Sequence, residues 1–263
     1  MVLSPAAVVD CNLCEAMRFF GSATDKGGVH DYAGVTVIDS GVNYSVFNIS
    51  LFRDPPVANR IDFNLRLTSP EQYFQRRGVR WSHWVCLDLL PTDLRSRADE
   101  AFRQRGLRRL TEAPNMIASR LEPAQRPLPP VSWRPVADAE TRLSFAHITS
   151  IAFEIPFATA REVYKPAQAW NGTYQGYVGY VRNTPVSTAA IVVAGGVIGV
   201  YSVGTLPGFR KRGYAEALLR NVLAYVTRVT GIEQYALQST RAGYDMYRCM
   251  GFADVARFAV YMT

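Results

Sequence analysis

The sequence is poor in the residues that build disulfide frameworks and metal centres. Its 263 residues include four cysteines and three histidines, too few and too scattered for a disulfide scaffold. Cys11 and Cys14 form a CxxC pair, but no second pair and no paired histidines follow, so the pattern of a zinc site is incomplete. We expect two reduced thiols on an N-terminal helix, no metal, and a cytoplasmic protein, since nothing resembles a secretory signal.

Long apolar runs and two common nucleotide-binding fingerprints are also missing. The longest apolar candidate, AIVVAGGVIGVYSVG, is shorter than the roughly 20 residues of a membrane span. Glycines also interrupt it, and its apolar residues suit buried strands better. Neither GxxxxGK[ST] nor GxGxxG occurs. The sequence therefore predicts no membrane partner, and neither fingerprint explains a nucleotide site.

What the chain has is a modest excess of positive charge, +7 with a pI near 9.4. This excess favours anionic partners such as phosphorylated cofactors. Twenty-two acidic residues dilute it. Apart from Arg210, Lys211 and Arg212 there is no clustered basic run and no recognition-helix pattern. We expect local positive sites and no nucleic-acid partner.

A proline-rich stretch divides the chain. EPAQRPLPPVSWRP, residues 122–135, carries five prolines, which favour extended linker conformations. We predict an N-terminal domain over residues 1–121, this linker, and a C-terminal domain over residues 136–263.

Residue patterns in both parts predict a mixed α+β fold. Before the linker, β-branched and aromatic runs predict strands over residues 34–39, 44–52 and 81–90, with a helix over 96–105. After it, the patterns predict a helical pair from residue 141 and strands over 174–182, 186–195 and 196–203, then a helix over 212–226, a strand over 233–238, a helix over 242–250 and a strand over 253–262.

Two segments resemble each other across the linker. The segments that start at Phe102 and Tyr247 follow the same order: an aromatic residue, three intervening residues, a glycine, a large apolar residue and then a predicted strand. Such short matches also arise by chance, so the sequence leaves open whether the halves are copies of one fold. If they are, the first copy has lost the glycine and basic turn described next.

The stretch GTLPGFRKRGYAEALL, residues 204–219, carries the clearest chemistry. A strand enters a glycine-containing turn and then a helix, whose first N–H groups have no intrahelical partner. Such an N-terminus favours a phosphate group. Gly213 lets the backbone approach an anion, Ala215 keeps the next position open, and Arg210, Lys211 and Arg212 add positive charge.

RKRGYA, residues 210–215, resembles the R/Q-x-x-G-x-G/A signature of the GNAT superfamily of N-acetyltransferases, and LQSTRAGYDMYRCMGF resembles the second conserved block of that family. The resemblance covers residues 136–263 well. It implies a central twisted mixed sheet flanked by helices, with acetyl-CoA as co-substrate, and we expect two tandem GNAT-like halves. The residues that it assigns to the cofactor are Val203, Gly204, Thr205, Arg210, Lys211, Arg212, Gly213, Tyr214, Ala215, Glu216, Ser239 and Thr240.

The same resemblance suggests two catalytic residues. Tyr247 stands where many members have a tyrosine that protonates the leaving thiolate; packing on the terminal strand is the alternative. Members commonly place a glutamate base on the fourth strand, but GVIGVYSV has no carboxylate. Glu154 would border the acceptor site, or would be an ordinary solvated glutamate. Ser239 and Thr240 would equally well cap the following helix.

These observations favour an N-acetyltransferase that acts on a primary amine of a small molecule or peptide. A non-catalytic acyl-CoA sensor of the same fold is the alternative, since the fourth strand lacks a carboxylate. The sequence identifies neither the acceptor nor the oligomeric state, so a homodimer is left open.

Overall fold

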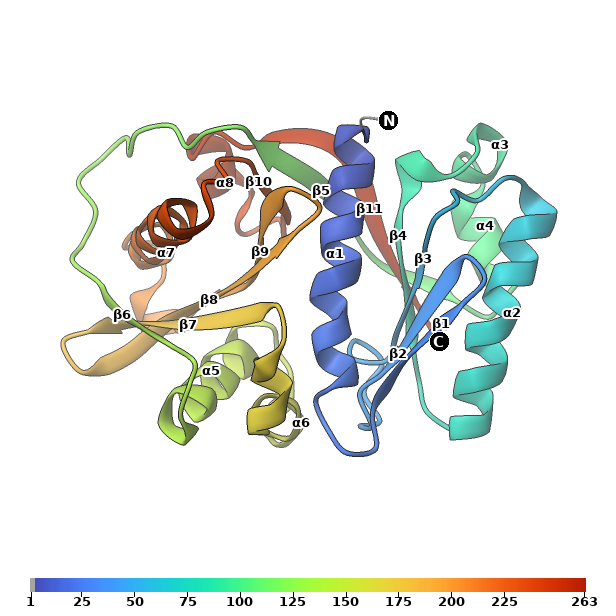
Figure 1. The fold of residues 1–263 in the computed structure, drawn as a ribbon, viewed down its shortest axis with the longest axis horizontal. Coiled ribbons are helices and arrows are strands. Elements are labelled where there is room, and N and C mark those ends of the chain that lie inside the picture. Colours follow the sequence, from blue (N-terminus) through green and yellow to red (C-terminus); the bar gives the residue numbers. More distant parts are fainter. Residues whose placement is uncertain (1–2) are drawn as a thin grey trace.

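The computed structural model describes residues 3–263, whose strands form a single sheet of eleven strands (Figure 1). Before the linker the elements are α1 (Pro5–Gly21), β1 (Gly28–Tyr32), β2 (Val35–Asp39), β3 (Ile49–Phe52), α2 (Arg60–Arg77), β4 (Ser82–Cys86), the 3₁₀ turn η1 (Leu87–Leu89), α3 (Thr92–Arg95), α4 (Ala98–Arg103) and β5 (Arg108–Ala118).

The later elements are β6 (Ser132–Pro135), α5 (Ala139–Ala152), α6 (Phe157–Tyr164), η2 (Ala167–Asn171), β7 (Tyr174–Val181), β8 (Thr184–Ala194), β9 (Val197–Thr205), η3 (Pro207–Phe209), α7 (Tyr214–Thr230), β10 (Tyr235–Gln238), α8 (Tyr244–Cys249) and β11 (Ala253–Met262). None of the helices within residues 3–263 is both long and apolar enough to cross a bilayer.

The order of the strands relates the two halves. It runs β1-β2-β3-β4-β11-β5-β10-β9-β8-β7-β6. On both sides two antiparallel pairings lead to one parallel pairing, β3 with β4 and β9 with β10. The last strand of each half then lies in the other half's part of the sheet, because β11 pairs with β4 and β5 pairs with β10. The sheet therefore has the topology of two similar halves that exchange their final strands.

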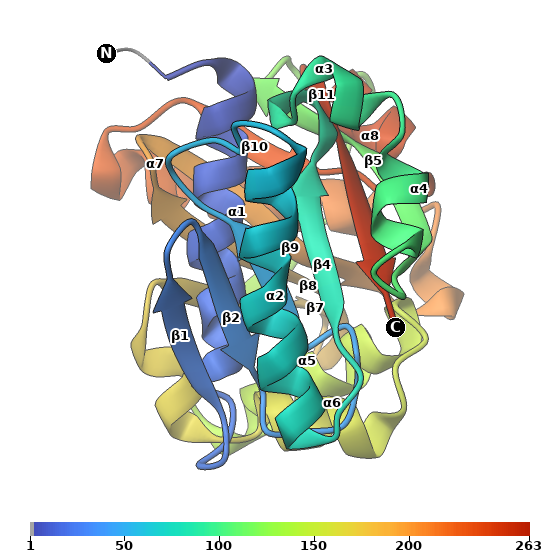
Figure 2. The ribbon, with the colours of Figure 1, turned by 90° about the vertical axis from the view of Figure 1, so that its right-hand side faces the viewer.

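Helices cover both faces of the sheet. Side chains of α1, α5 and α6 share one core on one face, where α1 crosses the middle of the sheet (Figure 1). On the other face α7 and α8 pack over the C-terminal strands, and α2 and α4 pack over the N-terminal ones. Figure 2 shows α2 over its strands, with β4 and β11 side by side. The layers are those of a mixed sheet flanked by helices, as the sequence predicted.

Some predicted boundaries were wrong, for identifiable reasons. The strand predicted over 44–52 begins at Ile49, because residues 45–47 form a turn closed by the bond from Phe47 N to Tyr44 O. Helix α2 was missed, since Pro70 lies inside it and proline argues against a helix interior. The helix predicted from Arg212 begins at Tyr214, because Gly213 has a left-handed φ of 86°.

The proline-rich stretch is only partly a connection. Its last four residues, 132–135, form β6, which pairs with β7 at the edge of the sheet, where a proline is tolerated. The predicted division into domains over 1–121 and 136–263 stays a prediction, and β11 crosses that division to reach β4.

One buried side chain joins α1 to the C-terminal strands. Asn12 is fully buried, and its Nδ2 donates to the carbonyl oxygens of Val192, Ala194 and Val197 at 3.1, 3.0 and 3.3 Å. Its Oδ1 accepts from the Tyr201 hydroxyl at 2.5 Å. Because buried polar groups are costly when unpaired, this residue fixes α1 against β8 and β9.

We predict that Asn12→Ala lowers the free energy of unfolding by about 2–4 kcal/mol, because it leaves buried carbonyl and hydroxyl groups without partners. Urea unfolding followed by circular dichroism measures the change. The control is Asn221→Ala on the exposed side of α7, expected within about 0.5 kcal/mol of the parent protein. An equal effect of both substitutions would contradict the role of Asn12.

Candidate functional site

The turn between β9 and α7 is held in an unusual backbone conformation. Lys211 and Gly213 both have left-handed φ angles, 60° and 86°. Glycine adopts this conformation without the steric penalty that a side chain brings. The turn η3 precedes them, with Phe209 N bonded to Leu206 O and Arg210 N to Pro207 O. The chain thus reverses just before α7 and leaves the helix N-terminus open.

The amides of this turn are free. Ala217 N is the first helical amide with a partner, the carbonyl oxygen of Gly213 at 2.9 Å, and no side chain among residues 3–263 caps the helix. Within the part of the chain that the structure describes, the amides of residues 211–216 have no hydrogen-bond acceptor. They present N–H groups and the positive end of the helix dipole to an incoming anion.

The charges around the turn also favour binding of an anion. The side chains of Lys211 and Arg212 are exposed and form no ion pair with any residue of 3–263. The Nε of Arg210 donates to Thr205 O at 2.9 Å. Glu216 is neutralised by Arg220 at 2.9 Å. The positive charge of the turn is therefore not offset by its nearest carboxylate.

The linker also reaches this turn, which the sequence did not predict. A Cβ placed on Gly213 would lie 3.1 Å from Cδ of Pro129 and 3.7 Å from a terminal nitrogen of Arg126. Arg126 thus adds a cation beside the free amides. No local pattern in the sequence identifies this residue, because its proximity depends on the path of the linker.

Strands β9 and β10 part beside the turn. Their pairing ends at Val200 with Leu237, while β9 continues to Thr205. The edge of residues Val203, Gly204 and Thr205 that faces away from β8 has no β10 partner. A register shift and a positive φ of 46° at Ser202 bend β9 at this point. The predicted cofactor residues 203–205 thus lie on this open edge. Residues 210–216 lie in the turn after η3 and in the start of α7.

Tyr247 lies on α8 in the same core as Val203, Leu218 and Leu237. Its ring is buried beside Phe252, and its hydroxyl makes no hydrogen bond with residues 3–263. Burial raises the pKa of its phenol above the ordinary value. The side chain therefore stays protonated at neutral pH and retains a proton to donate.

Glu154 lies on the opposite face of the sheet, in the turn after α5. It is exposed and has a left-handed φ of 56°. Two residues earlier, Ala152 packs against Gly204, where an added Cβ would lie 2.8 Å from that of Ala152. The turn that carries Glu154 is thus anchored near the point where β9 leaves β10, while its carboxylate faces solvent.

Ser239 and Thr240 lie at the end of β10, on an open groove of about 910 Å³ that Tyr244 and Asp254 also line. The Ser239 hydroxyl donates to Thr240 O at 2.9 Å, and Thr240 Oγ1 accepts from Gly243 N at 3.3 Å. Thr240 therefore caps the turn that leads into α8. The assignment of both residues to the cofactor stays a prediction.

The corresponding helix start in the N-terminal half is closed. The side chain of Asn59 accepts from the amides of Ile61 and Asp62 at 2.9 and 3.1 Å. The Asp62 carboxylate accepts from Ala58 N and from Arg66, both at 2.8 Å. A carboxylate of the protein thus stands where an anion would bind, so of these two corresponding helix starts the one before α7 is the open one.

A family model and several solved structures are similar to this chain. The sequence model of the Acetyltransferase (GNAT) family matches residues 143–252, and no curated protein matches the sequence. A GCN5-related N-acetyltransferase from Kribbella flavida has a TM-score of 0.72 at 17% identity, covering 99% of this chain and 96% of that one. One from Sphaerobacter thermophilus has a TM-score of 0.60 at 17% identity, covering 99% and 93%.

A tandem GNAT protein from the clavulanic acid biosynthesis pathway has a TM-score of 0.57 at 11% identity, covering 87% of this chain and 78% of that one. These structural similarities cover both halves of the chain. The family match covers the whole turn from Val203 to Glu216. Residues 143–252 are thus similar to the Acetyltransferase (GNAT) family, and the whole chain has the fold of solved GNAT structures, one of them a tandem GNAT protein.

Proposed function

We propose that this protein is an acetyl-CoA-dependent N-acetyltransferase that transfers the acetyl group directly to a primary amine of a small molecule or peptide. The observation that carries the proposal is the row of free amides at residues 211–216, next to positive charge that no nearby carboxylate offsets. A diphosphate fits such a site, because several N–H donors and a helix dipole converge on it. Coenzyme A contains this group and acetyl-CoA supplies an activated thioester.

The open edge of β9 would hold the rest of the coenzyme. Residues 203–205 have unpaired main-chain groups along the side that β10 leaves, and these can pair with amide groups as a neighbouring strand would. Arg126 and Lys211 would add charge-assisted contacts to phosphate. The thioester would then lie between β9 and β10, in reach of both faces of the sheet.

Two side chains would move protons. As the amine nitrogen attacks the carbonyl carbon and the carbon–sulfur bond breaks, Tyr247 would donate its phenolic proton to the leaving sulfur. The amine must lose a proton, and β9 offers no carboxylate for this. We assign that proton to Glu154 or to solvent next to it, because its turn is anchored against Gly204.

The N-terminal half would act as support for this site. Its own helix start is closed by Asn59 and Asp62, so we propose that coenzyme A binds once per chain. The four cysteines of the chain are free thiols, which suits the cytoplasm. The lack of a carboxylate on β9 also favours one alternative, a non-catalytic acyl-CoA-binding protein, and the second experiment below separates the two.

We predict that Gly213→Val weakens coenzyme A binding at least about tenfold, or about 1.4 kcal/mol. Valine strongly disfavours the left-handed φ of this position and its side chain would press on Pro129. Isothermal titration calorimetry measures the affinity. The control is Gly208→Val in the same turn, where a Cβ meets open space. Unchanged affinity in a folded Gly213→Val protein would refute the amide site.

We predict that Tyr247→Phe lowers kcat about 100-fold and leaves the affinity for coenzyme A within about twofold. Free thiol release from acetyl-CoA, measured over a panel of primary amines, reports turnover. The control is Tyr225→Phe, an exposed tyrosine on α7, expected to keep the parent rate. Coenzyme A binding without thiol release on any amine would favour the non-catalytic alternative.

A further inference from the structure

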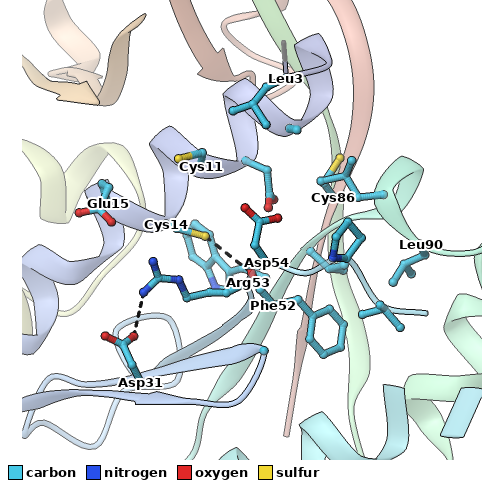
Figure 3. A pocket seen from close by; sticks show the side chains of 18 of the residues that line it. Leu3, Cys11, Cys14, Glu15, Asp31, Phe52, Arg53, Asp54, Cys86 and Leu90 are labelled. Atoms are coloured by element: carbon cyan, nitrogen blue, oxygen red, sulfur yellow. Dashed lines mark hydrogen bonds and ion pairs between the residues drawn. The ribbon is translucent and has the colours of Figure 1, made fainter. Parts of the chain in front are cut away.

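A second concave site lies in the N-terminal half. It is a cavity of about 340 Å³ between α1, the loop after β3 and the end of β4 (Figure 3). We call it the N-terminal cavity and define it by Asp10, Phe52, Asp54, Trp84, Val85 and Leu90. Its volume falls in the range of small-molecule sites. None of the residues assigned above to the acetyltransferase site lines it.

The topology explains why a cavity forms here. The parallel pairing of β3 with β4 ends at Leu51 with Trp84, as the pairing of β9 with β10 ends at Val200. Beyond that point Phe52 and Val85 belong to diverging chains. The cavity therefore occupies the place in the first half that corresponds to the open strand edge in the second.

One side of the N-terminal cavity is apolar. Phe52, Trp84, Val85 and Leu90 contribute aromatic and aliphatic surface. Such a wall suits the hydrocarbon part of a ligand, since removing it from water is favourable.

The other side carries carboxylates without partners. Asp10 on α1 and Asp54 in the loop after β3 both line the cavity and are close enough to repel each other. Neither forms an ion pair or a side-chain hydrogen bond with any residue of 3–263. Figure 3 shows Asp54 pointing towards α1. By contrast, Asp31 is paired with Arg18 at 3.0 Å and with Arg53 at 3.1 Å, so Arg53 is already engaged.

This arrangement selects the charge and the class of the ligand. Two unpaired carboxylates repel phosphate, and the nearby start of α2 is closed by Asn59 and Asp62. Within residues 3–263 no three side chains of histidine, cysteine, aspartate or glutamate are arranged to hold a metal ion. An organic cation with an apolar part fits this cavity, because its charge can pair with the carboxylates and its hydrocarbon can contact the apolar side.

We propose that the N-terminal cavity binds an amphipathic organic ammonium compound, with the ammonium group between Asp10 and Asp54 and the hydrocarbon part against Phe52 and Trp84. Binding here does not depend on the acetyl transfer proposed for the C-terminal half. It gives the N-terminal half a ligand of its own, other than coenzyme A.

The first experiment compares three ligands of similar shape by calorimetry: phenethylammonium, the neutral phenethyl alcohol and the anion phenylacetate. We expect the ammonium compound to bind at least about tenfold more tightly than either of the others. Asp10→Asn and Asp54→Asn should each weaken it at least about tenfold, and the exposed Asp25→Asn should not. Equal binding of the amine and the alcohol overturns the proposal, as does binding that both cavity variants retain, which would locate the amine elsewhere.

Thermal unfolding gives a second readout. Burial, and secondarily the charge of Asp54, raises the pKa of Asp10 from 3.8 to about 7. The folded chain therefore holds this proton more tightly than the unfolded chain, and its stability falls as pH rises through that interval. The other ionisable groups that line the cavity are Cys11, Cys14, Glu15, Asp31, Tyr32, Arg53 and Cys86.

We expect Asp10→Asn to unfold at a higher temperature than the parent at about pH 8 and at a similar temperature at about pH 4. Phenethylammonium should raise the unfolding temperature of the parent and not of Asp10→Asn. A parent protein that phenethylammonium does not stabilise, or a variant that it stabilises equally, contradicts the proposal. If Asp10→Asn does not fold, Asp54→Asn, whose side chain is exposed, provides the comparison of stabilisation by phenethylammonium.

Discussion

The pairing of β11 with β5 in the middle of the sheet is the constraint on which the rest of the molecule depends. These are the last strands of the two halves, and they pair antiparallel over most of their length. Through β4 and β10 each strand also completes the sheet of the other half. Neither half therefore contains all the strands of its own part of the sheet. The half whose helix start is closed therefore still supports the other, because its β5 flanks β10, next to the point where β9 and β10 part.

The sequence identifies what depends on neighbours along the chain. The turn over residues 210–215, the strands around it and the match between Phe102 and Tyr247 are local patterns, and the last agrees with α4 and α8 preceding β5 and β11. Features that depend on contacts between distant segments could not be predicted from the sequence. The register of Val260 with Trp84, the approach of Arg126 to Gly213 and the meeting of Asp10 with Asp54 join segments that no periodicity connects.

The two halves treat the same structural position in opposite ways. Each has a parallel strand pair that parts and a helix that begins after it. Before α7 the amides are left free and the surrounding charge is positive. Before α2 the amides are bonded to Asn59, and Asp62 supplies the negative charge. The same contrast in charge is found in the N-terminal cavity. The half whose helix start is closed by a carboxylate of the protein also has a cavity with unpaired carboxylates.

The closed start of α2 also limits how this chain can evolve. Arg66 is nearly buried and bonds Asp62 together with the carbonyl oxygens of Gly34, Arg53 and Pro55. Losing Asp62 alone would strand that guanidinium without its counter-ion, and losing Asn59 alone would leave the carboxylate in place. An open helix start in this half would therefore require several coordinated changes, whose intermediates are less stable than either end point. The contrast between the two helix starts is in this sense protected against single substitutions.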